Sequence, residues 1–274
     1  MTQPTRMPVV FFGHGSPMNT VESNRHTQAW HALGASLPRP RAILSVSAHW
    51  YIEGAAVTAM QTPPTIHDFF GFPQALFDIE YPAPGDPALA ARVRALLAPV
   101  EIALDDSWGL DHGTWSVLAH AYPQADIPVV QLAIDATQPA AWHYELGQRL
   151  APLRDEGVLI IGSGDVVHNL RTLRWGENAA PYDWATRFNE WARERIEAGD
   201  HAPLVAFETQ GADARASIPT PEHYLPLLYV LGAQQAGDPV WFATDGIELG
   251  SISMLTCVIG QAAGKMSGQT GSLQ

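Results

Sequence analysis

The chain has little cysteine, little positive charge and no long apolar run. Its one cysteine, Cys257, lies within the apolar run 252–259, so neither a disulfide framework nor a thiolate metal site can be built. Lys and Arg number 15 against 28 Asp and Glu, which gives a formal net charge of −13, and no Lys/Arg cluster reverses that balance. Nucleic acids are bound through basic patches, so we expect no nucleic-acid partner.

Membrane and export signals are also missing from the sequence. No segment approaches the apolar length of a membrane span, and the first residues carry no signal-peptide pattern. We therefore expect no membrane partner and a cytoplasmic location. The composition, 46% hydrophobic and 16% charged, suits one large globular domain with a sizeable core. We predict a single domain over residues 1–263 and a poorly ordered tail over residues 264–274, which are rich in Gly, Ser and Gln.

Short apolar runs bounded by Gly or Pro predict buried strands, and amphipathic runs between them predict helices. Strands are expected at 9–12, 42–48, 129–134, 158–161, 240–243 and 251–259, and helices at 27–37, 88–98, 114–121, 139–153, 182–198 and 221–232. This alternation predicts an α/β fold, a three-layer α/β/α sandwich around a central mostly parallel or mixed sheet.

The segment from 61 to 84 is dense in proline and aromatic residues. It is too long and too apolar for a solvated linker, so we expect an ordered loop that covers something.

Histidines follow several of the predicted strands. The first strand runs into Gly13-His14-Gly15, the second into His49, and the strand at 158–161 is followed by His168. His112 lies beside a glycine, and His223 lies at an expected helix start. Because strand ends from different parts of a chain converge at one edge of an α/β sheet, this pattern indicates a mononuclear metal site.

Several motifs, in order along residues 9–260, carry a family resemblance. They are Phe12-Gly13-His14-Gly15-Ser16-Pro17, Ser47-Ala48-His49-Trp50, Ile66-His67-Asp68-Phe69-Phe70-Gly71-Phe72-Pro73, Leu110-Asp111-His112-Gly113-Thr114-Trp115, Gly162-Ser163-Gly164 with His168-Asn169-Leu170, and Pro221-Glu222-His223-Tyr224. Together they resemble the 4,5-DOPA extradiol dioxygenase family, a branch of the class III extradiol ring-cleavage dioxygenases.

The resemblance implies one divalent metal per chain, held by His14, His49 and His223. His168 would lie beside the metal as an acid/base, or reach it as a fourth ligand, and His112 would line the same pocket as a second catalytic histidine. Three neutral imidazoles suit zinc as well as ferrous iron, so the expected cofactor is Fe(II) for activity or Zn(II) as bound.

The implied reaction is extradiol cleavage of a catechol resembling L-DOPA, with a small aromatic diol and O₂ as the partners. The segment from 62 to 84 would cover the planar substrate and exclude water. The residues expected to contact the substrate are Ser16, Trp50, His67 and Phe70.

Two other functions fit the same histidines. In a zinc-dependent hydrolase, the three-histidine site would activate a water, and Asp165 or Glu222 would be available as the base. A noncatalytic metal-binding relative would keep the ligands alone. His112 and His168, beyond the minimum set of ligands, argue for catalysis.

Overall fold

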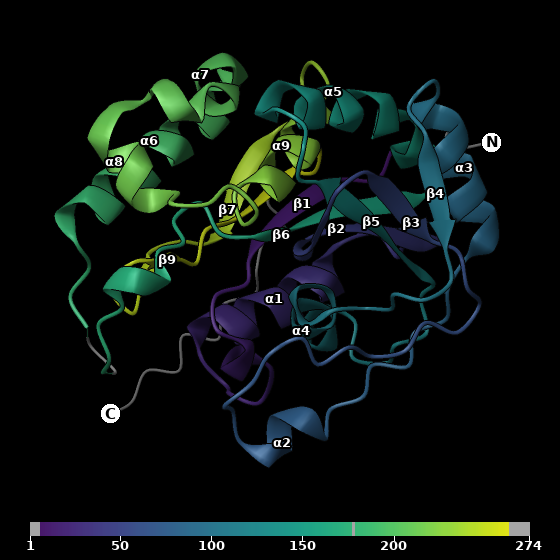
Figure 1. Cartoon of the computed structure of the whole chain (residues 1–274), viewed down its shortest axis with the longest axis horizontal. Helices are drawn as coiled ribbons and strands as arrows, with labels where there is room; N and C mark the ends of the chain where they lie inside the picture. The colour runs from purple at the N-terminus through teal and green to yellow at the C-terminus, as the bar shows by residue number, and fades with distance from the viewer. Residues whose placement is uncertain (1–5, 177–178, 263–274) are drawn as a thin grey trace.

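A computed structural model describes residues 6–176 and 179–262, and its centre is an eight-stranded sheet (Figure 1). The strand order is β4-β3-β5-β2-β6-β1-β10-β7. The strands of this sheet are β1 (Val9–Gly13), β2 (Ala42–Ile52), β3 (Ala55–Thr58), β4 (Ile102–Asp105), β5 (Val129–Asp135), β6 (Val158–Gly164), β7 (Val240–Thr244) and β10 (Thr256–Ile259), and the short strands β8 (Ile247–Glu248) and β9 (Ile252–Ser253) pair separately.

The central sheet is mixed, as the sequence predicts. Strands β1, β6, β2 and β5 run parallel to their neighbours in this group. Strand β10 pairs antiparallel with β1, β7 pairs antiparallel with β10, and β3 pairs antiparallel with β5 at the other end.

Helices cover both faces of the sheet, which confirms the three-layer sandwich. Figure 1 shows α3, α5 and α9 on one side, with α6 to α8 beside them, and α1 and α4 on the other side. The α-helices are α1 (Arg25–Ser36), α2 (Gln74–Phe77), α3 (Pro87–Leu97), α4 (His112–Ala121), α5 (Ala140–Leu150), α6 (Asp183–Ala198), α7 (His201–Val205), α8 (Gly211–Ser217) and α9 (Leu225–Gly232).

Strand β1 shows why the predicted strands are apolar throughout. Side chains alternate between the two faces of a strand. Val9 and Phe11 accordingly join one hydrophobic core, and Val10 and Phe12 join the other. A sheet that is buried on both faces needs continuous apolar strands rather than an alternating pattern.

The parallel strands β1, β2 and β6 end at the same edge of the sheet. Their register pairs Gly13 with Gly164 and Ser47 with Ser163. A Cβ at Gly164 would overlap the carbonyl oxygen of His223, so glycine lets the chain before α9 lie against β6. The sheet edge therefore gathers segments that are far apart in the sequence.

The structure departs from the predicted elements in a few places. His223 lies in a turn before α9, which begins at Leu225 rather than at 221. The strand predicted over 251–259 is divided into β9 and β10, because β9 pairs with β8 while β10 pairs with β1. The sequence did not predict the short elements β3, β4, α2, α7 and α8. The predicted tail at 264–274 lies outside the described residues.

None of the helices in the described ranges combines the length and the apolar character needed to cross a membrane.

Candidate metal centre

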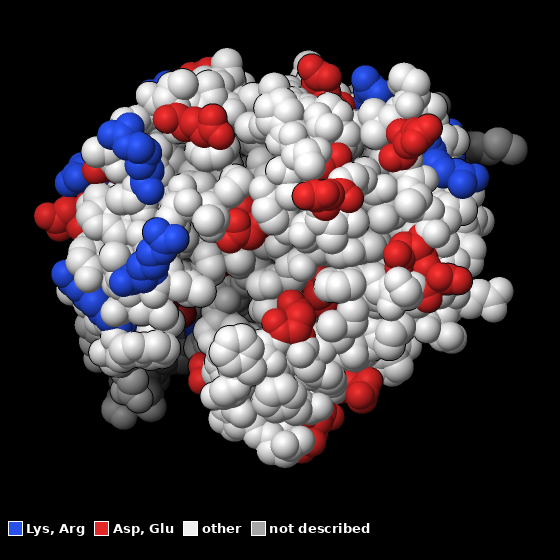
Figure 2. All heavy atoms as spheres, viewed as in Figure 1, with Lys and Arg blue, Asp and Glu red and all other residues white. Residues whose placement is uncertain are grey.

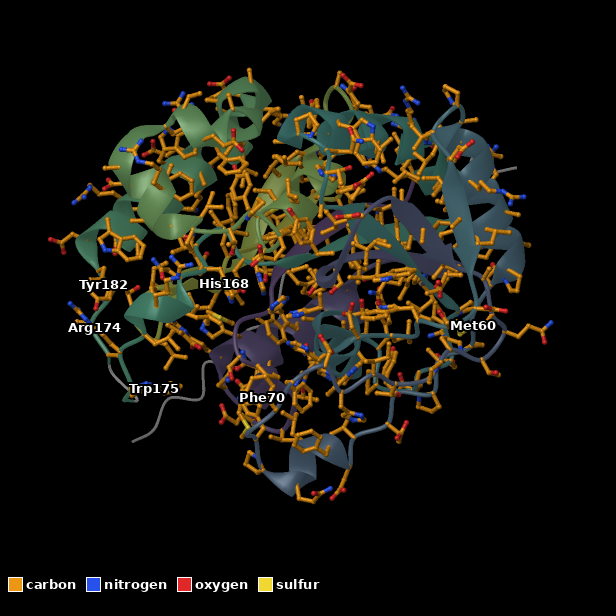
Figure 3. The ribbon with its side chains drawn as sticks, in the orientation of Figure 1. Met60, Phe70, His168, Arg174, Trp175 and Tyr182 are labelled. Carbon is orange, nitrogen blue, oxygen red and sulfur yellow. The ribbon has the colours of Figure 1, made fainter. Side chains whose placement is uncertain are left out.

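Five histidines line one cavity of about 310 Å³ at the sheet edge where β1, β2 and β6 end. Figure 3 labels His168 and Trp175, both on the segment between β6 and α6, and also Phe70 on the segment before α2. The lining residues are His14, Gly15, Ser16, Pro17, Met18, His49, Phe69, Phe72, His112, His168, Leu170, Leu173, Trp175, His223, Leu249 and Ile252. The five histidines that the sequence singles out are therefore brought together.

His14 presents its Nε2 atom to the centre of this cluster. Its Nδ1 lies 2.9 Å from Ser163 Oγ, and the one hydroxyl proton of Ser163 is donated to the carbonyl oxygen of Gly113. Ser163 Oγ must therefore accept the Nδ1 proton of His14, which leaves a lone pair on Nε2. That Nε2 lies 3.4 Å from Nε2 of His49.

His223 completes the predicted ligand set. Its ring centroid lies 5.3 Å from that of His14 and 5.0 Å from that of His49. Its Nδ1 lies 3.3 Å from a carboxylate oxygen of Glu222. An ionised carboxylate only accepts hydrogen bonds, so Nδ1 of His223 is the donor in this pair. Nε2 of His223 is therefore left unprotonated and able to bind a cation.

The ligating atoms fall into overlapping groups. His14, His49 and His112 form one group, and His14, Asp165 and His223 form another, with the ligating atoms of each group within 4.8 Å of one another. His14 belongs to both groups, so it connects the group that contains His49 with the group that contains His223. Oδ2 of Asp165 is buried 3.5 Å from Nε2 of His14 and has no hydrogen-bond partner among the residues that the structure describes.

The cluster is electrostatically suited to a divalent metal. Burial, followed by the neighbouring histidines, holds the pKa of His14 and of His223 well below the usual value. Burial, followed by the neighbouring His112, also holds the pKa of His49 well below its usual value. Neutral imidazoles have free lone pairs, so the residues present fit a metal ion.

His168 and His112 flank the three predicted ligands. Burial, with a smaller effect of His112, lowers the pKa of His168 to about 4, so the ring is neutral at neutral pH and free to accept a proton. A third group, made of His168, Glu222 and His223, also has ligating atoms within 4.8 Å of one another.

Asp68 lies behind His49 and His112. Burial alone would raise the pKa of Asp68, but contacts with His112 and His49 lower it below the usual value. This carboxylate is therefore ionised at neutral pH. Asp68 lies within the sequence motif at 66–73, but no role was predicted for it from the sequence.

Of the four predicted substrate contacts, Ser16 lines the cavity and the other three do not. Trp50 is buried and stacks on Trp108 with ring centroids 5.5 Å apart, because neighbouring side chains on β2 point to opposite faces. Nε2 of His67 donates to the carbonyl oxygen of Ile79 at 2.9 Å, which holds the covering segment together.

Phe70 is 91% exposed and lies outside the cavity, whereas its neighbours Phe69 and Phe72 line it. A second apolar wall comes from the segment after β6 and from the region of β8 and β9. We did not predict from the sequence that these segments line the site. The members of this wall are Leu170, Leu173, Trp175, Leu249 and Ile252.

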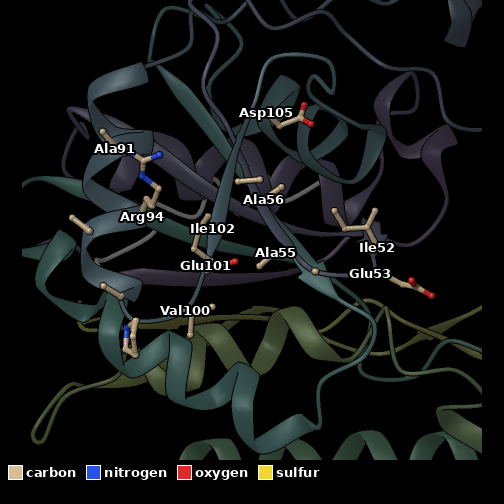
Figure 4. A pocket seen from close by; sticks show the side chains of 15 residues that line it. Ile52, Glu53, Ala55, Ala56, Ala91, Arg94, Val100, Glu101, Ile102 and Asp105 are labelled. Carbon is tan, nitrogen blue, oxygen red and sulfur yellow. The ribbon is translucent and has the colours of Figure 1, made fainter.

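A larger cavity of about 880 Å³ lies between α3 and the edge strands β3 and β4 (Figure 4). Its side chains are mostly small, including Ala55, Ala91 and Ala95, and no histidine or cysteine is among the described residues that line it. It therefore lacks the ligands that the histidine-lined cavity has. On the face in Figure 2, acidic side chains are spread widely, and Lys and Arg lie mainly toward the margins.

Comparison with known proteins agrees with this geometry. Residues 10–249 match a family model described as the catalytic LigB subunit of aromatic ring-opening dioxygenase. A protein of Escherichia coli K12 named 4,5-DOPA dioxygenase extradiol is 56% identical over 261 residues, covering 93% of this chain and 96% of that protein. A protein of Beta vulgaris with the same name is 39% identical over 231 residues, covering 81% of this chain and 85% of that protein.

The fold has a solved relative. The crystal structure of an uncharacterized protein from Escherichia coli K12 superposes with a TM-score of 0.82 and 50% sequence identity, and the match covers 93% of this chain and 100% of that one.

Proposed function

The chain belongs to the family of the catalytic LigB subunit of aromatic ring-opening dioxygenases, and we propose that its histidine-lined cavity performs extradiol cleavage of a catechol, with His14, His49 and His223 as ligands of one divalent metal. The observation that supports this ligand set is the position of the lone pairs on the imidazole nitrogens. Ser163 accepts the Nδ1 proton of His14, and Glu222 faces Nδ1 of His223, so that Nε2 of each ring is free.

A metal bound there would hold both oxygens of a catechol and, if ferrous, would pass electron density to O₂. Three protein ligands leave coordination positions open for this purpose. We propose Fe(II) as the metal of the active enzyme, and Zn(II) as an ion that the same imidazoles bind without redox chemistry.

The neutral His168 imidazole accepts the proton of a catechol hydroxyl and later returns it, as a general acid/base. His112 hydrogen-bonds the substrate from the other side of the cluster. The two roles are supported by the cavity, which both rings line, and by the pKa of His168 of about 4, which keeps its ring unprotonated before the substrate binds.

The apolar wall holds the aromatic ring and keeps water away. Phe69 lies edge-on to His112 with ring centroids 5.4 Å apart, and Phe72 lies edge-on to Phe69 at 5.5 Å. Leu173 and Ile252 line the same cavity. A planar catechol fits a space of about 310 Å³ bounded by such side chains.

The names of the relatives support L-DOPA as a first substrate to test. We also propose that residues 1–263 form one catalytic domain, which is supported by the single eight-stranded sheet that includes both β1 and β10. The cytoplasmic location expected from the sequence stays a prediction.

The experiment compares the same protein loaded with iron and with zinc. The iron-loaded form should consume O₂ with L-DOPA or another catechol and produce a yellow ring-opened semialdehyde, and the zinc-loaded form should leave catechol intact. The proposal fails if the iron form consumes no O₂ with any catechol tested. Hydrolysis of esters or amides by the zinc form, abolished in His49→Ala, would establish a zinc hydrolase instead.

A further inference from the structure

Asp68 makes contacts with two of the clustered histidines through one carboxylate. Its Oδ2 lies 3.3 Å from Nδ1 of His49 and 2.9 Å from Nδ1 of His112. The other oxygen, Oδ1, accepts the backbone N–H of His112 at 2.9 Å. Oδ1 therefore accepts a backbone N–H, and Oδ2 faces two imidazole nitrogens. Within the described residues, Nδ1 of His112 is buried and makes no hydrogen bond of standard geometry, so Oδ2 at 2.9 Å is the acceptor within its reach.

An ionised carboxylate only accepts hydrogen bonds. A ring nitrogen that faces it is stabilised as N–H, and in a neutral imidazole the other nitrogen then carries the lone pair. For His49 this places the lone pair on Nε2, the atom that lies 3.4 Å from Nε2 of His14.

We infer that Asp68 is a positioning residue, which sets the Nδ1–H tautomer of both His49 and His112 through one carboxylate. The inference rests on the proposed function, because it takes His49 as a metal ligand and His112 as a pocket residue. Carboxylates behind metal-ligating histidines fix the orientation of the ring and raise its basicity. Here one such group would serve a ligand and a neighbouring histidine that is not in the ligand set.

Asp68 is held in place from both sides. Ile66, two residues earlier, donates its backbone N–H to the carbonyl oxygen of Leu110 at 2.7 Å and accepts from Nε1 of Trp115 at 2.8 Å. The residue after Asp68 is Phe69, which lines the cavity. The segment that supplies Phe69 to the cavity wall is thereby connected to the proposed ligand His49 through the side chain of Asp68.

Asp68→Asn is a nearly isosteric test of this role. If the amide oxygen keeps the backbone N–H of His112, the amide NH₂ faces two Nδ1–H groups, donor against donor. If the amide is turned over, the NH₂ faces the backbone N–H instead. In the first arrangement the two Nδ1–H groups lose their acceptor; in the second they keep an amide oxygen, but only with donor set against donor at the backbone N–H of His112. Both arrangements weaken the contact that orients the rings, and we expect the affinity for zinc, measured by chelator competition, to fall by about 10- to 100-fold.

Glu80→Gln is the matched control. It removes the same charge from the same segment, at a side chain that is exposed. Its zinc affinity should equal that of the wild type. His49→Ala, measured in parallel, separates the two proposals. Unchanged zinc affinity in His49→Ala refutes the proposed ligand set, whereas loss of zinc in His49→Ala with unchanged affinity in Asp68→Asn refutes only the role of Asp68.

The second measurement needs no variant and so does not depend on Asp68→Asn being folded. In zinc-loaded wild-type protein labelled with ¹⁵N-histidine, the NMR shifts should show His112 protonated at Nδ1. His112 is the informative ring because it is not in the proposed ligand set. An unprotonated Nδ1 at His112 overturns the inference.

Discussion

The imidazole rings of His168 and His223 are stacked in parallel, with ring centroids 3.5 Å apart and an angle of 8° between the planes. One is the proposed acid/base, and the other is a proposed metal ligand. His223 is buried and His168 is half-buried, and the pKa values of both lie below the usual value. Two neutral rings can stack in this way, whereas two protonated rings would repel each other.

Removal of the His168 ring tests its role. In His168→Ala we expect kcat to fall by about 10²- to 10⁴-fold, the usual contribution of a general acid/base. Zinc or iron content should fall much less than in His14→Ala, because His223 loses only a stacked neighbour. Steady-state O₂ consumption and elemental analysis would measure both effects. His31→Ala, at an exposed histidine, is the control. Metal loss as great as in His14→Ala would identify His168 as a fourth ligand.

Ser163→Ala should weaken metal binding, although Ser163 is not itself a proposed ligand. The substitution removes the hydroxyl oxygen that accepts the Nδ1 proton of His14 and leaves that buried N–H without this acceptor. We expect metal affinity to fall by about 10- to 100-fold. Ser45→Ala is a suitable comparison, because it also removes a buried hydroxyl contact, with Thr114, and touches no histidine. Equal metal affinities in the two variants, measured by chelator competition, would contradict this assignment.

Phe69 and Phe70 are adjacent but should differ in their effect on catalysis. Phe69 lines the cavity, and Phe70 is 91% exposed. Loss of one aromatic wall contact costs about 1 to 3 kcal/mol, so kcat/KM for a catechol should fall by about 5- to 150-fold in Phe69→Ala. Phe70→Ala should leave kcat/KM close to the wild-type value. A greater loss in Phe70→Ala would show that the segment moves when substrate binds.

His143 should make the stability of the protein sensitive to acid. It is buried in α5, and its Nδ1 lies 2.9 Å from the hydroxyl oxygen of Tyr229. Burial lowers the pKa of His143 to about 4, below the value of about 6.5 in an unfolded chain. Between these two values the unfolded chain binds more protons, so this contribution to the free energy of unfolding is complete above about pH 6.5 and is lost as the pH falls toward about 4.

His143→Gln isolates this contribution, because glutamine does not titrate. Denaturant unfolding of the metal-free protein near pH 7 and near pH 5 should show a smaller loss of stability in the variant than in the wild type. The difference approaches about 1.4 kcal/mol per pH unit at most. Parallel losses in the two proteins would show that His143 is not neutral in the folded state.

The parts of the fold that depend on neighbours in the chain were predictable. An apolar run that ends in glycine predicted β1 and β6, and both strands are buried along their length. The amphipathic run at 88–98 predicted α3, whose first turn is capped by the Asp86 side chain, which accepts the N–H of Leu89. The short strands β3 and β4 were missed, because four residues with partial burial give no clear pattern.

The sequence by itself determined that His14, His49 and His168 would follow parallel strands, and therefore that they would meet at one edge of the sheet. Local apolar runs and glycines carry that information. Only the tertiary structure decided which nitrogen each ring presents, since His14 depends on Ser163 and His49 on Asp68, residues distant in the chain. These outcomes depend on contacts between segments, which no local pattern of residues encodes.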